Sequence, residues 1–487
     1  MITASFPSVA SLFLRKQQDE RLTVTHERDP AHRITSASVP GIFIELPEGK
    51  PAPVTWGQRA IWDAMADLDG RDQQFNLSWV ISLPASTTPL AVHRAVSALV
   101  QRHESLRSVY GKAADGTVWY RPLGPVRIPV RWLEASDEEA GEVAEKFASE
   151  MKSHSFRHES EPPLRIAVVG TLGNPRLVAF VVSHLVADFE GLRLVERELI
   201  RLLEKDSLES MPSAPTLLEL TRLQRSERGR REAERSINYW VETLRKAPPM
   251  STDPALGDLR SPRHWKGSLV SRALPGAVGV LTRESRVSSA AVVLAGVSWA
   301  VGRYTGTHQP CLMVMFNNRL REPYRSSVSP VALEGLFTVD TSGADLIELA
   351  RRAAYASLST YRYAQYSKPE LLTRIEDSGA DHTPLNRACW FNDLRTNREP
   401  LQPAQAEDLE REIERSVFRW VEQTDAHGHE AITVHLAESG DRWEVTLSAD
   451  TAVLGPRSIQ NALRELELAF VEAARNCRPE PHGAPAG

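Results

Sequence analysis

The chain has 487 residues, of which 41% are hydrophobic and 25% are charged, and it carries a net charge of −5 at pH 7. This composition is that of an ordinary globular protein with room for about two to four domains. No run of lysine and arginine lies beside interleaved aromatic residues, so we expect no nucleic-acid partner.

Three cysteines, Cys311, Cys389 and Cys477, lie far apart and form no CxxC pair, so we expect no bound metal. So few cysteines are typical of the reducing cytoplasm, which is the expected location. The N-terminal residues do not have the order of a signal peptide. No apolar run reaches the roughly 18–20 residues that span a bilayer, so we expect no membrane association.

The first half of the chain alternates helical and strand patterns after a polar N-terminal extension at residues 1–50, which contains one short strand at 41–46. Thr55 is expected to cap the first helix. Further helices are predicted at 89–110, 138–154 and 191–205, and strands at 75–83, 118–123, 128–133, 162–170 and 176–184.

The second half repeats this alternation after a predicted loop at 206–222, a charged connecting helix at 223–246 and a polar segment rich in proline and glycine at 250–270. Helices are predicted at 288–306, 344–366 and 455–476, and strands at 310–319, 387–394, 430–438 and 442–450. The pattern indicates two α+β lobes: an N-terminal lobe at 51–222, and the connecting helix with a C-terminal lobe at 223–476. Residues 477–487 are predicted to be a disordered tail.

The segment SHLVADF, residues 183–189, is the strongest candidate for a functional site. An apolar strand ends at His184, and Asp188 follows four residues later. A neutral imidazole at a strand end can accept a proton near physiological pH. An HxxxD match alone is weak, because such a histidine is more often structural than catalytic. Gly191 is expected to open the next helix.

Five other segments, in order along the chain, make the assignment more specific. They are PVTWGQRAIW at 53–62, RHESLR at 102–107, SFRHESEPPLR at 155–165, SINYWVETL at 236–244 and MFNNR at 315–319. With SHLVADF, they resemble the motifs of the condensation domains of nonribosomal peptide synthetases. This family lies within the chloramphenicol-acetyltransferase-like acyltransferase fold, and the resemblance runs from about residue 51 to about residue 474.

The resemblance implies an α+β fold in which two lobes form a V around a central active-site tunnel. By match to the family motif, His184 is the catalytic residue that positions or deprotonates the attacking nucleophile. By the same match, Asp188 is mainly structural and pairs with Arg319 of the later motif. Trp390 and Asn392 are tunnel-facing candidates by their position in the resemblance.

Two residues depart from the family motif HHxxxDG. Ser183 replaces the first histidine and Phe189 replaces the glycine, so a bulky ring is expected beside the catalytic loop. Gly191 is expected to supply the missing flexibility two residues later. These departures suggest unusual substrates or a pair of lobes kept for binding.

The resemblance favours a freestanding condensation enzyme of natural-product biosynthesis. It would join an acyl or aminoacyl thioester on a carrier protein, met in trans, to an amine or alcohol that is a small molecule or is itself carrier-bound. No cofactor is expected to be bound; the substrate would arrive on a phosphopantetheine arm, and the enzyme would be a monomer. Two alternatives stay open: a coenzyme A-dependent acyltransferase of the same fold, and a non-catalytic protein that docks carrier proteins or recruits another enzyme.

Overall fold

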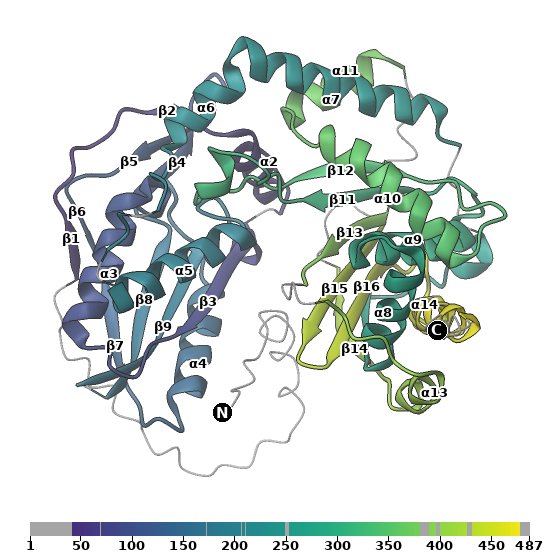
Figure 1. The fold of residues 1–487 in the computed structure, drawn as a ribbon. Coiled ribbons are helices and arrows are strands. Elements are labelled where there is room, and N and C mark those ends of the chain that lie inside the picture. Colours follow the sequence, from purple (N-terminus) through teal and green to yellow (C-terminus); the bar gives the residue numbers. More distant parts are fainter. Residues whose placement is uncertain are drawn as a thin grey trace, which may run out of the picture.

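The computed structural model describes residues 41–477 except 69, 172, 206, 210, 249–252, 380–388, 396–399 and 426–430. Two α+β lobes lie side by side and are bridged at one end by helices α6 (Leu217–Arg225) and α7 (Glu227–Lys246) (Figure 1). The predicted α+β class and the two lobes are confirmed. The expected extension and tail lie largely outside the described residues.

The N-terminal lobe is built on a four-stranded sheet with the order β3-β9-β8-β7. Its strands are β3 (Asn76–Ser82), β7 (Val130–Glu134), β8 (Leu164–Thr171) and β9 (Asn174–Ser183). Helix α4 (Ala140–Lys152) packs on one face, while α3 (Pro89–Arg102) and α5 (Phe189–Lys205) pack on the other. Both faces are therefore buried, which explains why β8 and β9 are almost continuously apolar.

Two smaller sheets complete this lobe. Strands β2 (Ala52–Pro53), β5 (Val118–Pro122) and β4 (Ser108–Lys112) form one, and β1 (Ile42–Ile44) pairs with β6 (Val126–Ile128) in the other. Helix α2 (Trp56–Ala66) begins with a capping box in which Thr55 and Gln58 exchange side-chain and backbone hydrogen bonds, as the predicted cap at Thr55 requires.

The C-terminal lobe carries a seven-stranded sheet with the order β12-β11-β13-β15-β16-β10-β14. Its strands are β10 (His264–Ser271), β11 (Cys311–Phe316), β12 (Leu333–Thr338), β13 (Cys389–Asp393), β14 (Val417–Thr424), β15 (Ile432–Ser439) and β16 (Arg442–Asp450). Its helices are α8 (Ala273–Ser285), α9 (Ser289–Thr305), α10 (Leu346–Arg362), α11 (Lys368–Asp377), α13 (Ala406–Glu414) and α14 (Pro456–Asn476).

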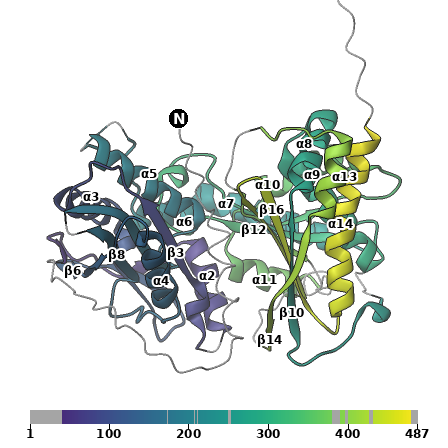
Figure 2. The ribbon, with the colours of Figure 1, turned by 90° about the horizontal axis from the view of Figure 1, so that it is seen from below.

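The two faces of this sheet differ. Val434 of β15 and Val445 and Leu447 of β16 point into the core beneath α9 and α14. Figures 1 and 2 show α8, α9 and α14 on the side of the sheet away from the N-terminal lobe. Because side chains alternate along a strand, residues such as His435 and Thr446 lie on the opposite face, which is turned toward the N-terminal lobe.

The sequence misjudged several boundaries. The helix predicted at 89–110 ends at Arg102, because the chain turns at His103 and continues as a short 3-10 helix and strand β4. The predicted loop at 206–222 contains the start of α6, and a break at Ser226 divides the predicted helix at 223–246 between α6 and α7. The polar segment at 250–270 contains β10, whose polar side chains lie on the lobe-facing side of a sheet.

No single described helix is long and apolar enough to cross a membrane. The consecutive helices α8 and α9 pass that test only as a pair bent by 106°.

Candidate active site

The candidate site begins where β9 ends and the chain turns toward α5. The backbone N–H of His184 donates to the carbonyl of Phe75 at 2.9 Å, and the N–H of Val186 donates back to Ser183 at 2.9 Å. Gln58 of α2 donates to the carbonyl of Leu185 at 3.1 Å. The turn is therefore held from both sides by neighbouring elements, which gives the His184 ring a rigid support.

The hydrogen bond of the His184 ring defines its tautomer. Nδ1 lies 2.9 Å from the carbonyl oxygen of Ala187. A carbonyl oxygen only accepts, so Nδ1 carries the proton and Nε2 holds the free lone pair. Nε2 has no hydrogen-bond partner within the described part of the chain. The turn therefore presents a proton-accepting nitrogen.

The environment of His184 keeps its imidazole neutral. Burial lowers the pKa of His184 below its usual value of 6.5, and the nearby carboxylate of Asp188 opposes that shift without reversing it. A neutral ring at physiological pH is the form that can act as a base.

Asp188 and Arg319 form the ion pair expected from the resemblance. Arg319 Nη2 donates to Asp188 Oδ1 at 2.6 Å, and both side chains are at least nine-tenths buried. The second carboxylate oxygen accepts from the backbone N–H groups of Val331 and Ala332 at 2.9 and 3.1 Å. Burial alone would raise the pKa of Asp188, but Arg319 and these N–H donors hold it below 3.8.

This pair connects the two lobes. Asp188 belongs to the N-terminal lobe, while Arg319 follows β11 in the C-terminal lobe and also donates to the carbonyls of Tyr324, Ser327 and Ser329. The geometry is that of a structural clamp, because both terminal nitrogens of the guanidinium bind the carboxylate or backbone carbonyls. The Nε atom is buried and has no hydrogen-bond partner among the described residues.

Gly191 occupies a different place from the one expected. Helix α5 begins at Phe189, so Gly191 lies inside its first turn and does not open it. The Asp188 side chain caps this turn by accepting from the Gly191 N–H at 2.8 Å. A Cβ at Gly191 would lie 3.2 Å from Asp188 Oδ1 and 3.5 Å from Arg319 Nη2. Its φ is not among the positive ones, so glycine here provides space instead of flexibility.

The side chain of Phe189 packs against the core of the N-terminal lobe. Its ring meets Trp79 of β3 edge to face, with 5.1 Å between the ring centroids. The indole N–H of Trp79 donates to Glu196 of α5 at 2.9 Å. The ring that replaces the motif glycine is thus part of the contact between α5 and the sheet.

Ser183 contacts a histidine that the sequence did not single out. Ser183 is fully buried, and its Oγ lies 3.0 Å from His158 Nε2 and accepts from the Leu185 N–H at 3.3 Å. His158 Nδ1 lies 3.8 Å from a carboxylate oxygen of Asp72. Burial lowers the pKa of His158, so this ring is also neutral. Ser183 has no exposed surface for attack on a substrate, so its hydroxyl holds the turn in place.

Two residues of the first motif also support the site, and sequence reasoning assigned neither a role. Gln58 holds the turn through Leu185, as described above. Gly57 approaches the backbone carbonyl of Pro330 so closely that a Cβ would lie 2.2 Å from it. The sequence offered one signal for their role, which is that both residues lie close to the capping residue Thr55. Their contacts could not be predicted from it, because those contacts join elements that lie far apart in the chain.

Trp390 and Asn392 lie on β13, on the face of the C-terminal sheet that is turned toward the other lobe, and both are partly buried. The Trp390 ring meets His435 of β15 edge to face at 5.2 Å. Their predicted place in a substrate tunnel stays a prediction.

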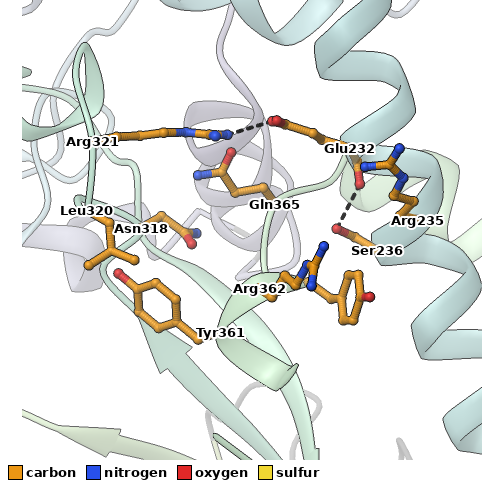
Figure 3. Close-up of a pocket in the computed structure, with 10 residues that line it drawn as sticks. Glu232, Arg235, Ser236, Asn318, Leu320, Arg321, Tyr361, Arg362 and Gln365 are labelled. Carbon is orange, nitrogen blue, oxygen red and sulfur yellow. Dashed lines mark hydrogen bonds and ion pairs between the residues drawn. The ribbon is translucent and has the colours of Figure 1, made fainter. Parts of the chain in front are cut away.

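A surface cavity of about 310 Å³ lies beside the Arg319 segment (Figure 3). Helix α7, the segment after β11 and the end of α10 contribute three arginines, Arg235, Arg321 and Arg362, to its lining. Arg321 pairs with Glu232 at 2.7 Å, whereas Arg235 and Arg362 have no ion-pair partner among the residues that the structure describes. The cavity therefore carries a net positive charge suited to an anion.

Among the described residues, no group of three or more histidine, cysteine, aspartate or glutamate side chains is placed to hold a metal ion.

The sequence relatives of this chain include synthases and synthetases, among them a nonribosomal peptide synthetase from Salinispora arenicola. The chain is 26% identical over 272 residues to chondramide synthase from Chondromyces crocatus, which covers 54% of this chain and 7% of that protein. The chain spans only 2–7% of the length of the first four curated relatives that it matches.

Solved structures support the fold. The condensation domain that mediates chain release from the enacyloxin polyketide synthase matches with a TM-score of 0.67 at 17% identity, covering 95% of this chain and 87% of that one. The X-domain from teicoplanin biosynthesis matches with a TM-score of 0.62 at 16% identity, covering 89% and 96% of the two chains. The match extends over both lobes in each case.

The family model of the condensation domain matches residues 50–480, which is most of the chain and includes His184, Asp188 and Arg319. The resemblance drawn from the six sequence motifs is thereby confirmed, and the chain belongs to the condensation-domain family.

Proposed function

We propose that this protein is a condensation enzyme that transfers an acyl or aminoacyl group from a carrier-protein thioester to an amine or alcohol nucleophile. Membership of the family supports the reaction class. The observation that carries the proposal is the Nε2 of a neutral His184, which has no hydrogen-bond partner among the described residues and is held rigidly by Ala187 and by the turn after β9.

In the proposed reaction, the nucleophile attacks the thioester carbonyl carbon and the C–S bond breaks. His184 Nε2 accepts the proton that the nucleophile loses and returns it to the departing thiolate, so charge and atoms balance. Asp188 lies close enough to stabilise the imidazolium that forms between these steps. Holding thioester and nucleophile together supplies much of the remaining rate enhancement.

The basic cavity beside the Arg319 segment supports delivery of the substrate on a phosphopantetheine arm, because the phosphodiester of that arm is an anion. We expect Arg362→Ala to raise KM for a loaded carrier by roughly two- to fivefold, as for an exposed charge contact of about 0.5–1 kcal/mol. A thioester of N-acetylcysteamine, which lacks the phosphate, should be unaffected.

Arg351→Ala is the matched control, because Arg351 lies on the same helix α10 but outside the lining of the cavity. Equal changes in KM for the two thioesters, or an equal effect of the control, would refute a role in binding the arm.

The function is tested by intact-protein mass spectrometry with separately produced carrier proteins. Each carrier is loaded with an acyl or aminoacyl group and mixed with this protein and a panel of amines and alcohols. Loss of the acyl group with formation of the matching amide or ester is the expected result, and it identifies the nucleophile class. The same panel is run with the acyl-coenzyme A.

Turnover of the coenzyme A thioester alone would replace the proposal by a coenzyme A-dependent acyltransferase. Binding of the loaded carrier without acyl transfer to any nucleophile would replace it by a docking or recruitment role.

A further inference from the structure

A row of polar side chains crosses the lobe-facing side of the C-terminal sheet. In the strand register, Asn392 of β13 lies beside His435 of β15, His435 opposite Thr446 of β16, Thr446 opposite Ser268 of β10, and Ser268 opposite Arg419 of β14. We call these five residues the polar row. The strands carry apolar residues on the helix-covered face, so the row is confined to one side of the sheet.

The outer end of the polar row is satisfied internally. Glu444 accepts hydrogen bonds from Ser268 Oγ and from Arg419 Nη2, the latter at 3.0 Å. This contact neutralises the charge of Arg419 and uses the hydroxyl of Ser268. The outer end of the row therefore needs no ligand.

The middle of the polar row is not satisfied. Thr446 is only 4% exposed, and its hydroxyl has no hydrogen-bond partner within the described residues. His435 Nδ1, directly opposite in the register, is also buried and has no partner in the same part of the chain. Buried polar atoms are nearly always paired, so two adjacent unpaired atoms indicate a place where another molecule supplies the partner.

We propose that His435 and Thr446 form a substrate subsite that binds an uncharged polar group, a hydroxyl or a primary carboxamide, on the acyl or nucleophile substrate. This inference rests on the proposed function, because it places the subsite on the wall that faces the lobe carrying His184. Trp390, edge to face with His435, provides an apolar flank for the carbon chain that bears the polar group.

The charges around the subsite disfavour a cationic ligand group. Burial, together with a smaller effect of the Lys266 ammonium, lowers the pKa of His435 to about 3, so the imidazole is neutral at physiological pH. A cationic substrate group would be repelled by Lys266. A neutral imidazole and a hydroxyl can together donate one hydrogen bond to a ligand and accept another from it, and a hydroxyl or carboxamide can make both.

The test measures binding of matched probes and does not depend on turnover. The probes are non-hydrolysable pantetheine amides in two isosteric pairs, threonyl with valyl and asparaginyl with leucyl, and calorimetry gives Kd for each. We expect the native protein to bind at least one polar probe about tenfold or more tightly than its apolar isostere. A site built to hydrogen-bond a substrate group discriminates strongly against the analogue that lacks it.

Thr446→Val should reduce this ratio to near one and should raise the melting temperature of the ligand-free protein, because it removes an unpaired buried hydroxyl at constant shape. His435→Phe should reduce the ratio in the same way. Thr433→Val is the control, since Thr433 lies on the same strand and face as His435 but outside the polar row, and it should leave the ratio unchanged.

Equal binding of both members of each pair, or no binding of any probe, would overturn the subsite. A lower melting temperature for Thr446→Val would also overturn it, since the hydroxyl would then have a structural partner. Discrimination without turnover by any nucleophile would refute the proposed function and keep the subsite. Turnover without discrimination would refute the subsite and keep the proposed function.

Discussion

Replacing Arg319 by alanine removes the cation from the clamp that joins the two lobes. The variant leaves the buried carboxylate of Asp188 without its guanidinium partner, and three backbone carbonyls lose the donor that they share. Breaking a buried ion pair from one side costs about 3–5 kcal/mol. Three backbone N–H donors remain on Asp188, so the lower end of that range is expected.

The corresponding change in melting temperature follows from the size of the chain. Unfolding entropy is about 2.1 cal/mol/K per residue, so 487 residues give about 1 kcal/mol/K. Arg319→Ala should therefore lower the melting temperature by about 3–5 °C if the lobes unfold together. Scanning calorimetry is the assay, and it also shows whether the single transition of the native protein divides into two.

Arg321→Ala is the matched control, because Arg321 lies two residues away and forms an exposed pair with Glu232. Such a pair is worth about 0–1 kcal/mol, which corresponds to at most about 1 °C here. The reasoning is refuted if the two variants lower the melting temperature equally. It is also refuted if the effect of Arg319→Ala persists unchanged at a pH low enough to protonate Asp188, whose pKa in the folded protein lies below 3.8.

Three further predictions concern the turn that carries His184. Its lowered pKa places the acid limb of the kcat/KM profile below pH 6.5, and a limb at pH 7 or above would contradict a neutral, buried base. Ser183→Ala should cost about 1–3 kcal/mol in chemical denaturation, because it removes the partner of both His158 Nε2 and the Leu185 N–H. A fall in kcat above about a thousandfold would instead show a chemical role. Gly191→Ala should destabilise the protein by about 1–3 kcal/mol, because the added Cβ would crowd Asp188. The control Gly141→Ala should stabilise the protein by about 0.5–1 kcal/mol, because Gly141 lies in helix α4 with open space around it. Stability changes of the same sign for both variants in denaturant titrations would contradict this account.

Much of the fold could be predicted because helical and strand periodicities are local properties. The cap at Thr55 was placed correctly, and the strand predicted at 176–184 is β9, which ends one residue earlier at Ser183, since each depends on residues adjacent in the chain. Helix α3 was extended too far because the apolar spacing continues to Leu106, while the chain turns at His103. His103 is buried against Glu198, 95 residues away, and no local pattern reports that contact.

The residues of the candidate site could also be predicted only in part. His184, Asp188 and Arg319 could be named because they lie in motifs of a known family, and the structure brings Asp188 and Arg319 into contact. The partner of Ser183 could not be named, because His158 reaches it across 25 residues. The polar row could not be seen either, because its members come from five strands whose order differs from their order in the chain. Spatial register, which a single sequence does not contain, assembles them.

The measurement that tests the central claim most directly is a single-turnover comparison of the native protein with His184→Ala. The loaded carrier that supports turnover is mixed with excess enzyme and nucleophile, and product is followed by quenched-flow mass spectrometry. Circular dichroism and the melting temperature establish that the variant is folded. The account predicts that product formation falls by about a hundredfold or more while carrier binding is retained, as expected when a base that acts in the transition state is removed. An unchanged rate in the folded variant would contradict the assignment of His184 as the catalytic residue.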